Sequence, residues 1–230
     1  MNIKLTLAEG FLLLALDNKK GKFLIDSIAL NHGLAGAVLM KLTILKKINI
    51  EHRRVYVIDS GETGSAFYDS ILQYLQARKK PRKVRFWVHK LATRLRKQKY
   101  ELIDNLVRQG ILIKQKQRLL GFIPCTTYPT VDSTPEDELR SQLLAIIRGK
   151  RTTDPKSLML LSLLEATKLT RALFYQRRAY KFAHKRIKAL TREFETSNLI
   201  HITIKEVCAA VITASTSAAV APDSDVSGSF

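Results

Sequence analysis

The chain has 230 residues, of which 46% are hydrophobic, enough to bury one sizeable core without a second domain. Its formal net charge is +19 and its pI is about 10.1, so solvent-facing helices must carry a surplus of Lys and Arg. This excess predicts an acidic partner, and net charge alone does not separate nucleic acid from anionic lipid. The two cysteines, Cys125 and Cys208, lack CxxC spacing and are predicted to be free thiols in the reducing cytosol.

No export or membrane-spanning segment is expected. Residues 1–7 hold no basic stretch followed by an apolar run, and the first apolar run, residues 11–16, is short. The longest stretch of small and apolar residues, 207–221, is interrupted by Thr and Ser and falls short of the roughly 20 residues that span a bilayer. Any membrane contact is therefore predicted to be peripheral.

The first third of the chain predicts two helices and a β-hairpin. Thr6 and Glu9 form a capping box ahead of an apolar run, which predicts a helix that ends near residues 17–21. A second helix is expected over residues 34–47, where small residues at 33–37 favour close helix packing. Two segments then alternate at period two across a polar link at 51–54, which is typical of a hairpin; they are residues 48–50 and 55–58.

The same order returns in the middle of the chain. A helix is predicted over residues 87–108 with Gly110 just past its end, followed by a strand at 111–113, a polar turn at 114–118 and a strand at 119–123. This recurrence limits the fold to helices decorated by hairpins, and it also resembles a winged-helix unit.

Helices are predicted for most of the C-terminal half. Ser133 and Glu136 form a second capping box, and Asp154 before Pro155 opens an apolar helix that we expect to be the best buried. A basic helix is predicted over residues 175–193.

The last predicted helix is short. Thr203 and Glu206 are expected to cap it, and it should end near Ser215. Residues 216–230 are low in complexity and are predicted to be a disordered tail, so the single domain is expected over residues 1–215.

Positive charge is concentrated between residues 78 and 118, which hold fifteen Lys and Arg against Glu101 and Asp104. Within the helix at 87–108, Trp87 and four leucines make the expected buried stripe, and the cations, including Arg96 and Lys99, are expected to flank it. Arg96 and Lys99 are i, i+3 neighbours, so an anion between them would relieve their repulsion. The residues leave three interpretations open: a solvated face, an anionic-lipid site and a nucleic-acid site.

The predicted strand at 119–123 is apolar on both faces. Either both faces are covered, as in a core strand, or the hairpin offers apolar groups to a membrane or partner. The side chains that would make this contact are Leu119, Leu120, Phe122 and Ile123.

No catalytic, metal or cofactor site is predicted, and the chain is expected not to be an enzyme. The common phosphate-binding, zinc-protease and serine-hydrolase signatures are absent from the sequence, and its five histidines lack metal-ligand spacing. The loop at residues 59–64 has two carboxylates and two glycines, but a turn followed by a helix N-cap explains it as well as catalysis does.

An ordered set of motifs from Leu5 to about Ser215 resembles the Golgi phosphoprotein 3-like family. The motifs are LTLAE at 5–9, LLLAL at 12–16, GLAG at 33–36, ETG at 62–64, NLVRQGIL at 105–112, TTYP at 126–129 and DP at 154–155. The resemblance implies a mainly α single domain, with a helical core ringed by amphipathic helices and short β-hairpins. It also implies a peripheral membrane protein that recognises phosphatidylinositol 4-phosphate, with a hydrophobic hairpin for membrane contact and self-association and, in eukaryotes, glycosyltransferase tails as cargo.

Carried over position by position, the resemblance implies headgroup binding by Arg96 and Lys99. The family's pocket Trp and a further Arg fall on Asp26 and Ala35, and a carboxylate beside a phosphate weakens its binding. The expected function is therefore an anionic-lipid adaptor that selects its headgroup loosely, on the cytosolic face of the Golgi if the source is eukaryotic. Because the pocket matches only in half, the chain is also compatible with a prokaryotic member of the family. The alternative function is that of a winged-helix-like nucleic-acid-binding protein.

Overall fold

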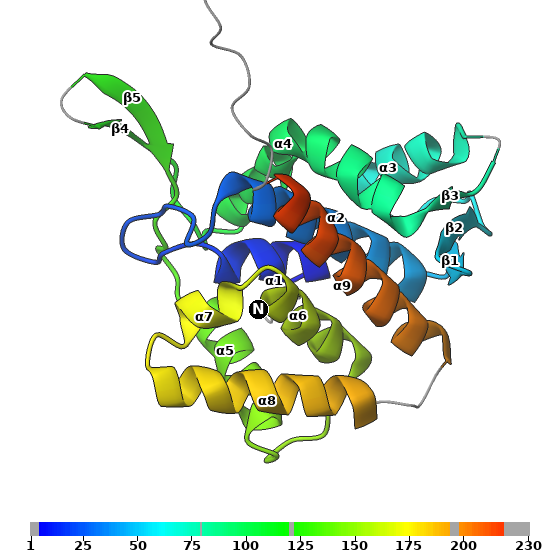
Figure 1. Ribbon diagram of the computed structural model, residues 1–230. Coiled ribbons are helices and arrows are strands. Elements are labelled where there is room, and N and C mark those ends of the chain that lie inside the picture. Colours follow the sequence, from blue (N-terminus) through cyan, green and yellow to red (C-terminus); the bar gives the residue numbers. More distant parts are fainter. Residues whose placement is uncertain (1–4, 79, 120–121, 194–197, 219–230) are drawn as a thin grey trace, which may run out of the picture.

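Helices dominate the part of the chain that the structure describes, and two small antiparallel sheets lie at the edges of that part (Figure 1). The computed structural model describes residues 5–78, 80–119, 122–193 and 198–218. The helices in that part are α1 (Leu7–Leu14), α2 (Ser27–Ile44), α3 (Ala66–Gln76), α4 (Val84–Arg108), α5 (Thr134–Ile147), α6 (Pro155–Ala166), α7 (Leu169–Leu173), α8 (Arg177–Glu193) and α9 (Asn198–Ala218). The strands are β1 (Ile48–Glu51), β2 (Arg54–Val57), β3 (Arg82–Lys83), β4 (Gln115–Leu119) and β5 (Ile123–Thr127). The predicted fold class, mainly α with short hairpins, is confirmed.

Helix α1 begins where the capping box predicted. The Thr6 hydroxyl accepts a hydrogen bond from the Glu9 amide at 3.2 Å, and the Glu9 carboxylate accepts one from the Thr6 amide at 2.8 Å. Every residue of α1 is buried, because α2, α4, α5 and α6 surround it.

Helix α2 begins at Ser27, seven residues before the predicted start, so the expected boundary was wrong. The physical reason is Asp26, whose carboxylate accepts hydrogen bonds from the amides of Ile28 and Ala29 at 2.9 and 2.8 Å and caps the helix. The segment after the cap contains Asn31 and His32, polar residues that hid the helical pattern although both are buried.

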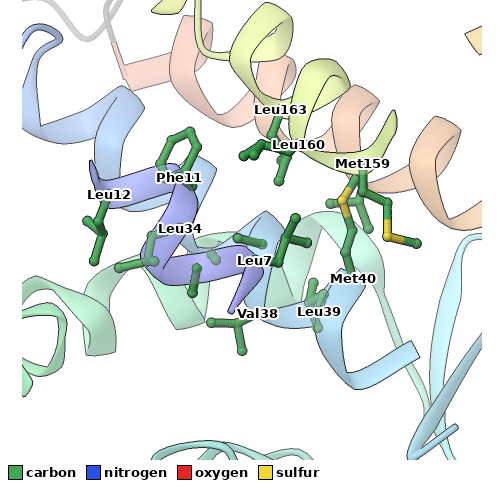
Figure 2. Close-up of a cluster of buried hydrophobic side chains, with 14 of the residues drawn as sticks. Leu7, Phe11, Leu12, Leu34, Val38, Leu39, Met40, Met159, Leu160 and Leu163 are labelled. Atoms are coloured by element: carbon green, nitrogen blue, oxygen red, sulfur yellow. The ribbon is translucent and has the colours of Figure 1, made fainter. Parts of the chain in front are cut away.

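The core forms where α2 packs against α1, α4, α6 and α9 (Figure 2). Figure 2 shows Leu7 and Phe11 of α1, Leu34 and Met40 of α2 and Leu163 of α6 among its buried side chains.

The predicted close packing at the small residues of α2 is confirmed. A Cβ atom at Gly33 would lie 2.4 Å from Cζ of Phe11, and one at Gly36 would lie 2.8 Å from a methyl carbon of Leu163. Both glycines therefore let neighbouring helices approach α2 closely.

Helix α9 is longer than predicted. It starts at Asn198, and Thr203 is fully buried inside it and does not cap it. Since α9 continues through Ala218, the first three residues of the predicted tail are helical, and the rest of that tail lies outside the described residues.

By length and composition alone, two described helices could cross a membrane. They are α2, 78% buried over Ser27–Ile44, and α9, 33% buried over Leu199–Thr216. The sequence estimate counted only residues 207–221 and so missed the apolar first half of α9. In this fold α9 packs against α2, α4 and α6.

The other two N-caps predicted in the C-terminal half, at Ser133 and Asp154, had different outcomes. Asp154 caps α6 as expected, accepting a hydrogen bond from the Ser157 amide at 3.0 Å. The expectation that α6 is the best-buried helix was wrong, because every residue of α1 is buried, whereas Pro155, Lys156 and Glu165 of α6 are not. The capping box at Ser133 was wrong, because Glu136 is fully buried and pairs with Arg140 at 2.6 Å instead.

The hairpin at β1 and β2 is confirmed, and β3, which the sequence did not predict, adds a third strand to it. The second hairpin has a shifted register: residues 115–119 form β4, where a polar turn was expected, and Leu119 pairs with Ile123. The predicted apolar strand therefore straddles the tip. Leu120 and Gly121 at that tip lie outside the described residues.

Candidate functional site

The long helix α4 carries the predicted buried stripe. Trp87, Leu91, Leu95, Leu102 and Leu106 are each at most 2% exposed, which confirms the spacing. The stripe fixes which cations of the helix turn toward solvent.

Lys99 belongs to this stripe and does not flank it, contrary to expectation. Its side chain is buried, and its ammonium donates a hydrogen bond to the Asn31 Oδ1 at 3.1 Å. The ammonium also lies 5.3 Å from the ring centroid of Tyr100 and 5.8 Å from that of Phe23. Burial lowers the pKa of Lys99, and the charge of Arg96 lowers it further. The sequence did contain the signal, since Lys99 follows Leu95 by four residues.

The other predicted pocket positions are distributed between surface and core. Arg96 is exposed on α4, close enough to Lys99 to affect its pKa. Asp26 is exposed but its carboxylate is engaged as the α2 cap, and Ala35 is fully buried. Of the carried-over headgroup residues, only Arg96 is both cationic and exposed.

The loop at 17–22 and the base of the β4–β5 hairpin lie against each other beside α4. The Tyr128 amide donates to the Gly21 carbonyl at 2.9 Å, and the Thr130 amide donates to the Asn18 carbonyl at the same distance. Tyr100 of α4 completes the junction, its ring centroid lying 6.2 Å from that of Tyr128. Three segments distant in sequence thus meet where the hairpin leaves the helical body (Figure 1).

Exposed cations lie around this junction, and we call the surface that they form the hairpin-side face. Its members are Lys19, Lys20, Lys22, Arg96, Lys114, Lys116 and Arg118. Lys114 lies 3.8 Å from the Asp104 carboxylate, and both side chains are about half exposed, so this pair is screened by water and neutralises little of the face.

Apolar side chains are exposed around the same cations. They are Leu24, Ile28, Tyr100 and Ile113, at 37 to 44% exposure, and Phe122 beside the hairpin tip, at 73%. Exposed cations that alternate with exposed apolar side chains are suited to binding a surface that has both negative charge and apolar groups. Sequence reasoning found the hairpin but missed the loop at 17–22 and Leu24, because only the fold brings them together.

The loop at residues 59–64 is built as a turn. The Asp59 carboxylate accepts from the Gly61 amide at 2.7 Å and pairs with Lys47 at 2.5 Å. The hydrogen bond from Lys47 is the main cause that lowers the pKa of Asp59, and the Gly61 amide adds to it. A carboxylate fixed in this way serves the loop structure.

No group of three or more His, Cys, Asp or Glu side chains that could hold a metal ion occurs within the residues that the structure describes.

Comparison with known proteins agrees with the ordered motifs. The family model described as Golgi phosphoprotein 3 (GPP34) matches residues 7–211. The vacuolar protein sorting-associated protein 74 of Schizosaccharomyces pombe is 24% identical over 168 residues, which cover 64% of this chain and 49% of that protein. The chain thus spans about half the length of this curated relative. Because the family model covers almost the whole described fold, the chain belongs to the Golgi phosphoprotein 3 (GPP34) family.

Proposed function

We propose that this protein is a peripheral membrane protein that binds anionic phospholipid through the hairpin-side face. The observation that carries the proposal is the coincidence, at one junction, of seven exposed cations with exposed apolar side chains. Each cation near an anionic bilayer contributes about 1 kcal/mol, so several together hold a protein at the surface without a shaped pocket.

The lipid is an acidic phospholipid, with phosphatidylinositol 4-phosphate as the specific candidate from the family. Arg96 is the exposed headgroup ligand, and Lys99 supports it from its buried position on Asn31. Because Asp26 and Ala35 stand where the family has Trp and Arg, we expect weak discrimination between this headgroup and other anionic lipids.

The β4–β5 hairpin is the second membrane contact. Its tip residues Leu119, Leu120, Phe122 and Ile123 enter the apolar edge of the bilayer, while Lys116 and Arg118 stay with the headgroups. Among the described residues β4 and β5 pair only with each other, so each strand has one edge without a strand neighbour there, and such an edge also supports self-association between copies.

An adaptor role goes with this architecture, and no enzymatic activity or cofactor is proposed. The relative's name refers to vacuolar protein sorting, which supports a function in membrane traffic with protein cargo as partner. The corresponding location is cytoplasmic and peripherally membrane-associated, at the cytosolic face of the Golgi in a eukaryotic cell.

Liposome flotation tests the proposal. We expect flotation with phosphatidylserine vesicles and with phosphatidylinositol 4-phosphate vesicles, weakening with salt, and none with neutral phosphatidylcholine vesicles. Replacing three cations of the face, Lys20→Gln, Lys116→Gln and Arg118→Gln, should weaken binding by about a hundredfold.

The matched control removes the same charge from α8, on the other side of the helical body from the hairpin (Figure 1), by Lys181→Gln, Lys185→Gln and Lys188→Gln. Equal losses in both triple variants would show that only net charge matters. Absence of flotation with every anionic lipid, together with a gel shift of DNA or RNA at physiological salt, would replace this proposal with the nucleic-acid-binding alternative.

A further inference from the structure

A cavity of about 250 Å³ lies at the other end of α4 from the hairpin. It is bounded by β2, by the end of α3, by Arg78, Lys80 and Pro81 between α3 and β3, and by the first turn of α4. Trp87 and Lys99 are twelve residues apart on α4, roughly 18 Å along its axis. Figure 1 shows β2, β3 and the end of α3 at the opposite end of α4 from the β4–β5 hairpin. The cavity that these elements bound is therefore separate from the hairpin-side face.

Three cations line this cavity: Arg78, Lys80 and Arg82. No Asp or Glu is among the lining residues, and within the described chain none of the three cations pairs with a carboxylate. The C-terminal end of α3 adds a partial negative charge of roughly half an elementary charge, which three full positive charges outweigh.

Strand pairing and a hydrogen bond to the backbone position these side chains around the cavity. Arg82 lies on β3 opposite Val55 of β2, and the Pro81 carbonyl accepts a hydrogen bond from Arg54 at 2.8 Å, which ties Pro81 to β2. The Arg82 guanidinium lies 5.6 Å from the ring centroid of Phe86. A guanidinium held on an aromatic ring loses less freedom when it binds an anion.

The remaining wall is mostly apolar and aromatic, and Gln76 also lines it. Val57 and Trp87 contribute to it, and Trp87 is held edge-on by Tyr74 and Phe86, with ring centroids 5.7 and 5.2 Å away. The wall therefore has a fixed shape, and the cations are its main polar groups.

We propose that this cavity binds a phosphomonoester, with the phosphate among Arg78, Lys80 and Arg82 and the organic part of a small ligand against Val57 and Trp87. A phosphomonoester carries close to two negative charges at neutral pH, which suits three uncompensated cations better than a singly charged phosphodiester does. The volume is below the usual range for drug-sized ligands, so the ligand is no larger than a small headgroup or sugar phosphate.

Such a group reaches the cavity either as a soluble metabolite or as the headgroup of a phosphorylated lipid. The site itself is independent of the proposed membrane function, and only the lipid source rests on it.

Trp87 is the single tryptophan of the chain, so its fluorescence reports directly on the cavity. The probes are glycerol 3-phosphate as soluble monoester, dimethyl phosphate as diester, and vesicles of phosphatidylcholine with either phosphatidylinositol 4-phosphate or phosphatidylserine. We expect a saturable change with the monoester and with the phosphatidylinositol 4-phosphate vesicles, and a much weaker response to the diester and to phosphatidylserine. A change with those vesicles alone assigns the site to a lipid headgroup, and one with glycerol 3-phosphate alone assigns it to a soluble ligand.

The test variant is Arg78→Gln, Lys80→Gln and Arg82→Gln, which should weaken the monoester affinity at least about a hundredfold, since hydrogen bonds to charged groups are the strong ones. The matched control, Lys90→Gln, Lys97→Gln and Lys181→Gln, removes the same charge from exposed positions outside the cavity and should bind as the natural chain does. No saturable change with any monoester, or equal weakening in both triple variants, overturns the site. If the protein still floats with phosphatidylserine vesicles after that result, the membrane proposal holds and only the cavity proposal fails. If glycerol 3-phosphate titrates Trp87 but the protein does not float with any anionic vesicle, the cavity proposal holds and the membrane proposal fails.

Discussion

Lys99 and Arg82 are both cations beside aromatic rings near α4, yet the fold uses them in opposite ways. The ammonium of Lys99 is buried and bonded to Asn31, whereas the guanidinium of Arg82 lies over Phe86 at the wall of an open cavity. Lys99 lies in the register of the buried stripe, and Arg82 precedes the helix on an exposed strand. Two cations of the same basic segment therefore have different roles. Lys99 mainly joins α4 to α2, and Arg82 is available to a ligand.

The largest expected effect tests the buried member of this comparison. Asn31→Leu removes the hydrogen-bond acceptor of Lys99 and leaves a buried ammonium without it, so we expect the free energy of unfolding to fall by about 2–4 kcal/mol. Adding Lys99→Met should restore most of this loss, because replacing both partners with apolar groups is nearly neutral. Urea unfolding measures both variants, and a double variant no more stable than the single one would contradict the assigned role. Arg82→Gln is the surface control and should change stability by less than about 0.5 kcal/mol.

A somewhat smaller effect is expected at the hairpin, and it separates the two anion-binding regions. Phe122→Ser removes a large exposed apolar side chain whose burial in a bilayer contributes about 1.5–3 kcal/mol. Vesicle affinity measured by flotation should fall about ten- to a hundredfold, while the titration of Trp87 by glycerol 3-phosphate and the urea midpoint should not change. The control is Val131→Ser, which changes another exposed apolar side chain, in the loop between β5 and α5. A shift in the Trp87 titration would mean that the two regions are coupled.

The packing that places Asn31 beneath Lys99 is tested by Gly33→Ala. The added Cβ would lie 2.4 Å from Phe11 and 2.6 Å from Thr167, so side chains must move, at a cost of about 1–3 kcal/mol that a gain of up to about 1 kcal/mol in helix propensity offsets in part. Thermal and urea unfolding should both show the net loss. Gly10→Ala, whose nearest contact would be 3.3 Å away, should be close to neutral, and an equal loss there would argue against the close packing at Gly33.

The smallest effect concerns pH. Burial lowers the pKa of His32, and the neighbouring His89 lowers it further, so the folded protein binds this proton less readily than the unfolded chain does. As pH falls through the ordinary value of about 6.5, the unfolded state gains the proton first and the free energy of unfolding decreases until the lowered folded-state value is passed. Urea unfolding between about pH 7 and pH 5 should show this decrease. His32→Gln should flatten it, and His52→Asn, in the exposed β1–β2 turn, should not.

Several elements were predictable because their signals are local. The Thr6 and Glu9 capping box, the Asp154 cap and the stripe from Trp87 to Leu106 each depend on residues within a few turns of one another. Predictions failed where a competing contact came from elsewhere in the fold. Glu136 pairs with Arg140 in a buried setting instead of closing a capping box, and Thr203 is buried by the helices around α9.

The candidate sites divide in the same way. The sequence located the basic segment and the hairpin, and the motif order alone was enough to indicate the family. It could not place the loop at 17–22 against the hairpin base, because that contact depends on hydrogen bonds between residues more than a hundred positions apart.

By itself, then, the sequence determined the helical class, the caps and stripes that define α1, α4 and α6, and the excess of positive charge, since these follow from local spacing and composition. Only the tertiary structure decided which cations are available. It buried Lys99 against Asn31 and gathered Arg78, Lys80 and Arg82 around a cavity. The reason is physical: burial depends on what packs across a side chain, and that neighbour comes from a distant part of the chain.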